Sequence, residues 1–288
     1  MRTAIVTASF RGDFERCKLL CDSIDRRVSG HTQHYLLVEP QDVKLFSALA
    51  GPRRTIVDER DLLPSWLKVF PDPLTFGRRR IWLSPKGPPL RGWHVQQLRK
   101  LAMTATLEED GVLLCDSDTV FVQDMDVASQ WTGDAFAFYR KPGAIGDGMA
   151  EHRQWLRRAG ELLGIEDVRL PNTDYVAQAV GWRTDTVRDM LAHIEGHTGR
   201  PWIEPVARRR AFSECLIYGR YVDEVEHRPQ RHAPVETSIC HSYWSGAVLD
   251  DQRLQRFVDE AKPWQPAIGV QSFIGTDVGL IRRVAGLA

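Results

Sequence analysis

Asp116 and Asp118 stand one residue apart inside the apolar run 112–122, and they are the clearest candidates for chemistry in this chain. Side chains alternate between the two faces of an extended strand, so residues two positions apart point to the same side. The two carboxylates therefore converge on one point. Because carboxylates held this close repel each other, a hard divalent cation beside them stabilises the pair at neutral pH. The spacing predicts a Mg²⁺ or Mn²⁺ site at the end of a buried strand.

The tripeptide Asp-Ser-Asp also has a purely structural interpretation. Short polar side chains bond to their own backbone, so the same residues suit a turn or a helix N-cap. The flanking segments favour the metal site, because Val-Leu-Leu-Cys precedes the motif and Thr-Val-Phe-Val follows it. Apolar runs of this length are typical of buried strands. We therefore expect the aspartates to interrupt a core strand.

The composition is that of a globular protein with a sizeable core. Of the 288 residues, 43% are hydrophobic and 26% are charged, which gives no sign of disorder. The length allows one large α/β domain or a domain with a subdomain. The formal charge is zero, from 38 basic and 38 acidic residues, so nothing global points to nucleic acid or to an anionic membrane. Only a local patch could carry such a claim.

The cysteines and the apolar runs bear on the compartment. No apolar run approaches the ~20 residues that a membrane-spanning helix needs, and the N-terminus lacks the apolar core of a signal peptide. The five cysteines form no Cys-x-x-Cys pair, and Cys17 and Cys21 lie one helical turn apart, so we expect them to pack in a core rather than bind zinc. Buried free thiols fit a reducing compartment. We therefore expect a soluble, cytoplasmic protein without a membrane span.

Strand and helix patterns alternate in the first part of the chain. We expect strands at residues 3–9, 34–38, 55–57 and 112–122, and helices at residues 14–28, 43–49 and 93–106. Such alternation implies a parallel sheet with right-handed crossovers. Between residues 64 and 92, prolines, glycines and the run Arg78-Arg79-Arg80 indicate an irregular surface segment of open function.

The order of elements becomes less regular after residue 134. We expect strands at residues 134–139, 175–182 and 238–244, and helices at residues 151–163, 186–195, 211–222, 249–261 and 277–284. A glycine-rich loop is expected at residues 141–148, and a glycine-containing segment between the last two helices.

Polar residues follow each predicted strand of the first half. They are Thr7, Ser9 and Arg11 after the first strand, Glu39 after the second, Asp58 after the third, and Asp116 with Asp118 in the fourth. In open α/β sheets, ligands bind in the crevice beyond the carboxyl ends of the strands, so we expect these residues to line one crevice. Hydroxyl groups and an arginine opposite a metal pair suit a nucleotide diphosphate. Ordinary loop solvation is the alternative for Glu39 and Asp58.

The segment Leu114-Cys115-Asp116-Ser117-Asp118-Thr119-Val120-Phe121-Val122 resembles the DxD strand of GT-A glycosyltransferases, in which the motif holds a divalent metal on the sugar-nucleotide diphosphate. Residues 92–100 (Gly-Trp-His-Val-Gln-Gln-Leu-Arg-Lys) and 212–219 (Phe-Ser-Glu-Cys-Leu-Ile-Tyr-Gly) resemble a bacterial group with this fold, the DUF6492-type proteins. Cys115 stands where a bulky residue often precedes the motif, a change that affects packing rather than ligands.

The resemblance implies a fold and an arrangement of halves. The fold would be α/β of GT-A type, a Rossmann-like nucleotide-diphospho-sugar transferase fold whose mixed, mostly parallel sheet is flanked by helices. Residues 1–288 would form a single domain, with a nucleotide-binding half at residues 1–122 and an acceptor-binding half at residues 123–288.

The resemblance also implies a third metal ligand. In many GT-A enzymes a histidine late in the chain completes the metal shell, and His241 in Cys-His-Ser-Tyr-Trp is the matching candidate. A neutral imidazole beside two carboxylates favours Mn²⁺ over Mg²⁺. A packed or solvated histidine is the alternative.

Transfer of a sugar with inversion needs a carboxylate that takes the proton of the acceptor hydroxyl. Glu214 is the first candidate, because it lies in an otherwise apolar helix where burial would raise its pKa, and Asp174 is the second. A solvated or capping glutamate is the alternative, and transfer with retention needs no dedicated base. Gln97 and Lys100 lie about one turn apart on the preceding helix and would reach the phosphates or the donor sugar, unless they are solvated.

The sequence favours a glycosyltransferase that depends on Mn²⁺ or Mg²⁺ and moves a sugar from a nucleotide-sugar donor to an unidentified hydroxyl acceptor, with no nucleic-acid partner. One rival is a sugar nucleotidyltransferase, although such enzymes usually carry a glycine-rich signature after the first strand and neither GxGxxG nor GxxxxGK[ST] occurs here. The other rival is a non-catalytic carbohydrate- or nucleotide-binding module on the same fold.

Overall fold

A five-stranded mixed sheet forms the centre of the computed structural model, which describes residues 1–77, 79–166 and 168–287. Its strand order is β15-β8-β1-β3-β4. The strands are β1 (Thr3–Ala8), β3 (His34–Val38), β4 (Arg54–Asp58), β8 (Gly111–Cys115) and β15 (Ala179–Arg183). The first four pair in parallel, and β15 pairs antiparallel with β8. The protein is therefore an α/β protein with a mixed, mostly parallel main sheet.

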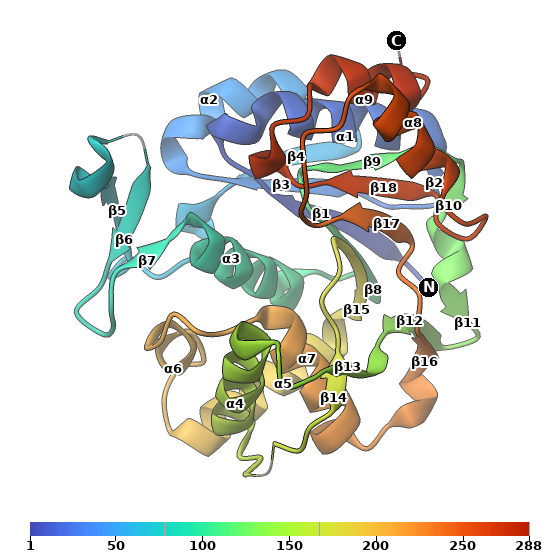
Figure 1. The fold of residues 1–288 in the computed structure, drawn as a ribbon. Coiled ribbons are helices and arrows are strands. Elements are labelled where there is room, and N and C mark those ends of the chain that lie inside the picture. The colour runs from blue at the N-terminus through green and yellow to red at the C-terminus, as the bar shows by residue number, and fades with distance from the viewer. Residues whose placement is uncertain (78, 167, 288) are drawn as a thin grey trace.

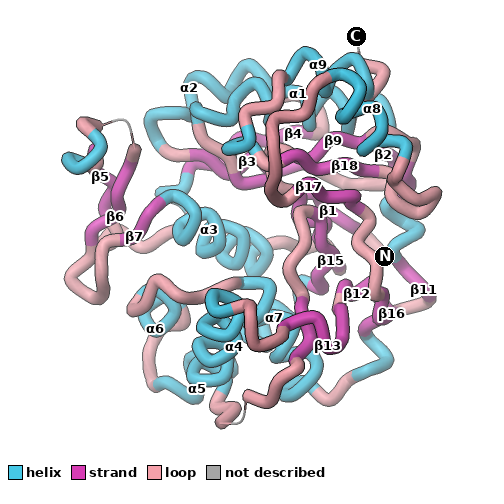
Figure 2. The backbone as a smooth tube through the Cα atoms, viewed as in Figure 1, coloured by secondary structure: helices cyan, strands magenta, loops and turns pink. Residues whose placement is uncertain are grey.

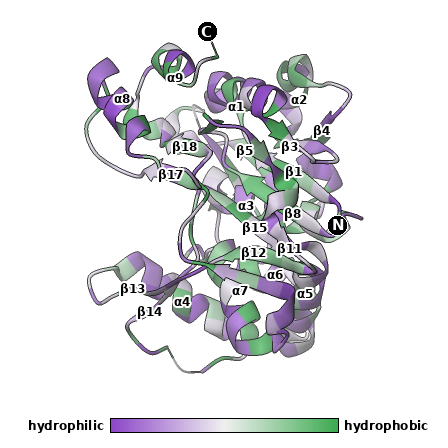
Figure 3. Ribbon diagram, turned by 90° about the vertical axis from the view of Figure 1, so that its right-hand side faces the viewer, coloured by the Kyte–Doolittle hydropathy of each residue, from purple (hydrophilic) through white to green (hydrophobic). Residues whose placement is uncertain are grey.

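Helices cover both faces of this sheet, as the alternation of side chains along β1 requires. Ala4, Val6 and Ala8 pack on one face, with α3 (Gly92–Thr106). Ile5 packs on the other face, with α1 (Phe14–Arg27). Every residue of β1 is buried, which is expected of a parallel strand between two helical layers. Figure 3 shows the hydrophobic strands inside and the more hydrophilic helix α8 (Asp251–Asp259) outside.

A second sheet begins where the aspartate motif ends. Its three strands have the order β17-β18-β9 and are β9 (Thr119–Phe121), β17 (Cys240–Tyr243) and β18 (Ala267–Val270). The expected single strand at residues 112–122 is thus wrong. Residues 116–118 form a connection through which the chain leaves β8 in the main sheet and enters β9 in the second one. The motif therefore joins two sheets.

The remaining helices and short strands surround these two sheets. The other helices are α2 (Val43–Phe46), α4 (Ala150–Leu163), α5 (Thr184–Thr198), α6 (Ile203–Ala207), α7 (Glu214–Tyr221) and α9 (Val278–Val284). Short strands are β2 (Val28–Ser29), β10 (Met125–Asp126), β11 (Trp131–Thr132), β12 (Ala135–Tyr139), β13 (Lys141–Ile145), β14 (Asn172–Asp174) and β16 (His232–Val235). Helices α1, α2, α8 and α9 lie at one end of the molecule, and α4 to α7 at the other (Figure 1).

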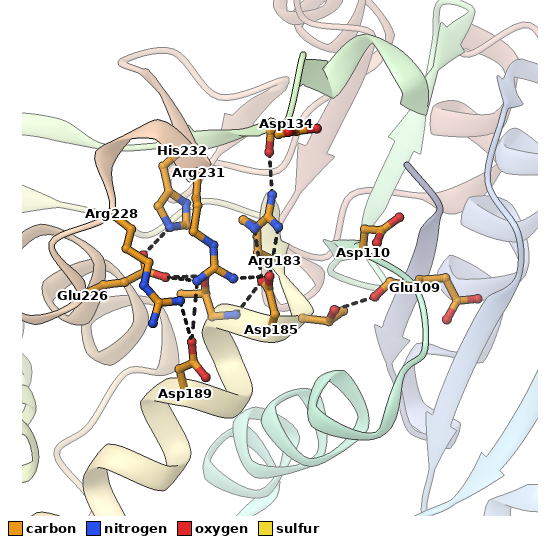
Figure 4. Close-up of polar contacts among 12 residues, drawn as sticks. Glu109, Asp110, Asp134, Arg183, Asp185, Asp189, Glu226, Arg228, Arg231 and His232 are labelled. Carbon is orange, nitrogen blue, oxygen red and sulfur yellow. Dashed lines mark hydrogen bonds and ion pairs between the residues drawn. The ribbon is translucent and has the colours of Figure 1, made fainter.

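A partly buried network of charges links β15 of the main sheet to α5 and to the segment that leads into β16. Glu226 accepts hydrogen bonds at 2.9 Å from Arg231 and at 2.9 Å from Thr186, and it lies 2.6 Å from the His232 ring. Arg183, at the end of β15, pairs with Asp185 at 2.9 Å. Figure 4 shows these side chains pointing toward one another from β15, α5 and the segment that leads into β16. Because the charges satisfy each other, this cluster is structural.

Two segments expected to lack regular structure contain strands. Within residues 64–92 the chain forms the antiparallel strands β5 (Lys68–Pro71), β6 (Arg80–Leu83) and β7 (Leu90–Arg91), which stand apart from the other strands (Figure 2). The predicted loop at residues 141–148 contains β13, which pairs with β14. Of the strand predicted at residues 175–182, only the part from residue 179 onward is in a strand, β15. The predicted glycine-containing segment between the last two helices contains β18. Arg78 lies outside the described residues.

The cysteine prediction is confirmed, because all five cysteines are free and buried. Cys17 and Cys21 pack in one apolar cluster with Phe46. Among the described residues, the structure contains no helix of the length and apolarity that a membrane span requires.

Candidate active site

A cleft of about 400 Å³ opens at the carboxyl ends of β1 and β8, and residues of α3, α4 and α7 also line it. Its polar lining comes from Ser9, Asp13, Gln96, Gln97, Lys100, Asp116, Ser117, Asp118, Gln178, Ser213, Glu214, Gln271 and Ser272. Its volume falls within the range of small-molecule sites. The predicted residues Ser9, Gln97, Lys100, Asp116, Asp118 and Glu214 therefore share one cleft.

The aspartate motif is held in place by its own backbone and by Gln178. The Asp116 backbone N–H donates to the Gln178 carbonyl at 2.9 Å, and the Thr119 N–H donates to the Asp116 carbonyl at 3.0 Å. The Asp118 carboxylate accepts from Gln178 Nε2 and from the Ser272 backbone N–H, each at 3.0 Å. These bonds fix the Asp116 backbone and the Asp118 carboxylate at the point where the chain passes from one sheet to the other.

Asp118 is in an environment that opposes its negative charge. Burial, and then the charge of Asp116, raise the pKa of Asp118 to about 7, while the Ser272 N–H opposes that rise. A carboxylate with a raised pKa beside a second carboxylate is a place where a cation is stabilising.

Lys100 lies between the carboxylates of Asp116 and Glu214 in the cleft. Its Nζ is 2.7 Å from Asp116 Oδ1 and 3.3 Å from Glu214 Oε1. Burial alone would lower the pKa of Lys100, but the charges of Asp116 and Glu214 raise it above its ordinary value. Burial raises the pKa of Glu214, and Lys100 opposes that rise. The lysine is therefore a fixed ammonium ion that links the aspartate motif to α7.

Gln97 positions the start of α7 rather than standing free for a ligand. Its Oε1 accepts from the Glu214 backbone N–H at 2.9 Å, and its Nε2 donates to the Trp93 carbonyl at 3.3 Å. Because that N–H belongs to the first residue of α7, it has no partner inside its own helix. Gln97 thus connects α3 to α7 directly beside Lys100.

Four residues expected at the strand ends lie away from this cleft lining. Thr7 points to the opposite face of β1 and hydrogen-bonds His34 at 3.1 Å. Arg11 pairs with Asp42 at 2.7 Å, and Asp58 accepts from Arg60 at 2.5 Å. Glu39 is buried and contacts Gln41. The expectation of one crevice at all the strand ends is therefore corrected, because these side chains are held by other protein groups away from the cleft lining.

His241 and Asp174 are not brought to the aspartate motif either. The His241 ring stacks on Phe257 with centroids 4.4 Å apart. Side chains alternate along β17, and Cys240, which the Asp118 charge influences, faces the other side. Asp174 accepts from the Val176 N–H at 3.1 Å and lies 3.9 Å from the His152 ring. Neither residue lines the cleft.

The structure adds cleft residues that sequence reasoning missed. Asp13, at the N-cap position of α1, makes no side-chain cap bond and lines the cleft. Burial raises the pKa of Asp13, and the hydroxyls of Ser272 and Ser117 oppose that rise. Gln178 and Ser272 contact Asp118 from distant parts of the chain, so no local signal could have found them. Asp13 lies in the connection between the first strand and the first helix, and this position was the available signal.

Aromatic side chains surround the polar floor of the cleft. They are Phe10, Trp93, Trp155, Trp244 and Phe273. Trp93, Trp244 and Phe273 are 45%, 46% and 74% exposed. Flat apolar faces beside amide and hydroxyl groups suit ligands that have both apolar faces and polar edges, such as sugars or nucleobases.

The charges of the lining decide what the cleft can hold. Four carboxylates line it, those of Asp13, Asp116, Asp118 and Glu214. Among the described residues of the lining, Lys100 is the one basic side chain. Among the described residues, no group of three or more His, Cys, Asp or Glu is arranged to hold a metal. A cation bound by Asp116 and Asp118 would thus need its other ligands from water or substrate, as Mg²⁺ commonly does. The acidic surplus and the raised pKa of Asp118 fit such a cation.

Comparison with curated proteins finds no significant match. The sequence model of one protein family matches residues 3–277, which is nearly the whole chain. The chain therefore belongs to the family of unknown function DUF6492.

Proposed function

We propose that this protein is a metal-dependent glycosyltransferase of GT-A type, which moves a sugar from a nucleotide-sugar donor to a hydroxyl acceptor. The observation that carries the proposal is the placement of Asp116 and Asp118 together in one cleft at the end of a central strand. Ligands of open α/β proteins bind at this end of the sheet.

The acidic lining supports a donor that arrives with a divalent cation. A nucleotide diphosphate alone would be repelled by the four carboxylates of the lining, which outnumber Lys100. A bound Mg²⁺ or Mn²⁺ ion would supply charge neutralisation of the diphosphate leaving group. Asp116 and Asp118 are the residues that would hold it, with Asp13 nearby.

The acceptor side of the reaction is assigned to Glu214. Its carboxylate lines the cleft, and burial raises its pKa toward the range that a general base needs at neutral pH. Lys100 keeps this carboxylate oriented at 3.3 Å. Asp174 lies outside the cleft lining, so Glu214 is the better candidate.

The test is a panel of UDP-, GDP- and dTDP-sugars, each incubated with Mn²⁺, Mg²⁺ or EDTA. Release of nucleoside diphosphate that EDTA abolishes supports a transferase, whereas pyrophosphate formed from a nucleoside triphosphate and a sugar phosphate supports a nucleotidyltransferase. Asp118→Asn should lose metal-dependent donor binding, and Asp124→Asn is the matched control, because Asp124 is exposed. If no donor binds, or if Asp118→Asn binds metal and donor like the wild type, the proposal fails.

We infer a reducing compartment such as the cytoplasm for this activity. All five cysteines are buried free thiols, and such thiols persist where disulfides do not form.

A further inference from the structure

The hairpin formed by β5 and β6 carries an apolar tip that is largely exposed to solvent. Leu74 is 81% exposed and Phe76 is 94% exposed, while Phe70 on β5 is 43% exposed. Exposed apolar residues are normal when scattered singly, but these lie within one short projecting element (Figure 1). The tip is therefore an exposed apolar surface in the part of the chain that the structure describes.

The backbone at the tip makes this surface harder to explain by folding alone. Phe76 has φ +51° and ψ +39°, in the left-handed region. A bulky residue is rare and unfavourable in that conformation. Asp72, which is buried, caps the turn by accepting from the Leu74 N–H at 3.0 Å. The fold thus presents an aromatic ring to solvent at a position where glycine or asparagine would be less strained.

The base of the hairpin is anchored firmly, so the tip is displayed on a rigid support. Trp82 of β6 is buried, donates to Glu59 at 3.1 Å and lies against the Arg99 guanidinium, 5.7 Å from its ring centroid. Glu59 in turn pairs with Arg99 at 3.0 Å. Strand β7 continues directly into α3. The projection is therefore fixed to the body of the protein.

Positive charges flank the apolar tip. Lys68 and Arg79 are exposed, and Arg80 is partly exposed. Among the described residues, none of these three side chains forms an ion pair, and the one acidic residue of the turn, Asp72, is buried. The chain as a whole has no net charge, so this cationic surplus is local.

We propose that this hairpin docks the protein on an anionic lipid bilayer. Leu74 and Phe76 would enter the boundary between headgroups and acyl chains, and Lys68, Arg79 and Arg80 would contact lipid phosphates. Buried apolar area and attraction between basic residues and anionic lipids together determine interfacial binding. The charge pattern favours an anionic membrane over a second copy of this chain, since two such hairpins would bring like charges together. The inference does not depend on the proposed function.

The experiment is co-sedimentation of the full-length protein with vesicles of phosphatidylcholine alone or with phosphatidylglycerol added. We expect binding to the anionic vesicles, weaker binding as salt rises, and little binding to the neutral ones. Leu74→Ser with Phe76→Ser should lower the partition coefficient by about tenfold or more, because two apolar side chains no longer enter the interface. Lys68→Gln with Arg79→Gln should lower the partition coefficient for anionic vesicles only, by about 30-fold, because two attractions to the anionic surface are lost.

Trp264→Ser is the matched control, because Trp264 is 57% exposed but lies outside the hairpin. It should leave vesicle binding unchanged, and circular dichroism of every variant should match the wild type. Absence of binding to anionic vesicles overturns the proposal, as does binding that the hairpin variants do not reduce. Light scattering that shows a dimer lost in the Leu74→Ser, Phe76→Ser variant would assign the surface to a second copy of this chain and would also overturn it.

Discussion

Lys100 places its Nζ 2.7 Å from Asp116 Oδ1, within the cleft that the aspartate motif lines. The same ammonium ion lies 3.3 Å from Glu214, and its side chain is only 9% exposed. One buried cation therefore compensates carboxylates from two halves of the molecule, so the site and the stability of the fold depend on the same contact.

Replacement of Lys100 by methionine should destabilise the fold. The change keeps the apolar stem and leaves Asp116 and Glu214 without their shared counter-charge. Breaking a buried ion pair from one side costs about 3–5 kcal/mol, and urea denaturation measures the loss. The double variant Lys100→Met, Glu214→Met should recover part of it, because one of the uncompensated charges is gone. A loss below about 1 kcal/mol in the single variant would contradict this role.

Glu214→Gln tests the assignment of the base and rests on the proposed function. The amide keeps the shape of the side chain but cannot take a proton from the acceptor. We expect kcat to fall by about 10²- to 10⁴-fold, with little change in donor affinity. The pH profile of kcat should also lose the limb that reports the Glu214 ionisation. Full activity in the variant would exclude the base role.

A matched control separates lost chemistry from lost stability. Glu226 is also buried and ion-paired, with Arg231 and His232, but it lies outside the cleft lining. Glu226→Gln should lower the free energy of unfolding, while the kcat of the folded protein in the proposed reaction stays near the wild-type value. A similar kcat loss in both variants would assign the effect of Glu214→Gln to folding.

Much of the fold could be predicted because its signals are local. Cys17, Cys21 and Ile24 recur at helical spacing, and α1 spans Phe14–Arg27 as expected. The apolar run of β3 is short and bounded, and its predicted limits match the structure. The strand β18 was missed because Ala-Ile-Gly-Val is brief and contains glycine. It exists through pairing with β9 and β17, which are distant in sequence.

The site was predictable only in part, because some of its contacts depend on the pairing of strands that are distant in sequence. Asp116 and Asp118 are near neighbours in the chain, so their convergence follows from spacing. Gln178 meets Asp118 only because β15 pairs with β8. His241 was misplaced because the face of a strand residue depends on pairing register, and a shift of one residue reverses it.

His241→Ala should affect packing and leave the proposed cation site at Asp116 and Asp118 intact. The ring stacks on Phe257 at 4.4 Å with planes 22° apart. Loss of such a contact costs about 0.5–1.5 kcal/mol, which urea denaturation measures. Titration calorimetry with Mn²⁺ in the presence of a nucleoside diphosphate should give the wild-type affinity, whereas Asp116→Ala should lose it. A large drop in Mn²⁺ affinity for His241→Ala would return this residue to the metal site.

Glu39 should make the stability of the protein fall as pH rises through the window from about 4.5 to about 7. Burial raises the pKa of Glu39 from 4.5 to about 7; the Arg99 charge opposes the rise, and Asp42 and Glu59 add to it. In this window the unfolded chain ionises Glu39 while the folded protein keeps it protonated. The unfolded state then binds fewer protons, so the free energy of unfolding decreases with increasing pH.

Glu39→Gln isolates this effect, because the amide is neutral at every pH. Each pKa unit corresponds to about 1.4 kcal/mol, so the variant should be more stable than the wild type by about 3 kcal/mol at pH 8 and by less than about 1 kcal/mol near pH 5. Urea denaturation at several pH values measures the difference. Asp61→Asn is the control, because Asp61 is exposed and the substitution should leave the pH dependence unchanged. A stability difference that is the same at pH 5 and pH 8 would show that the Glu39 carboxyl does not titrate in this window.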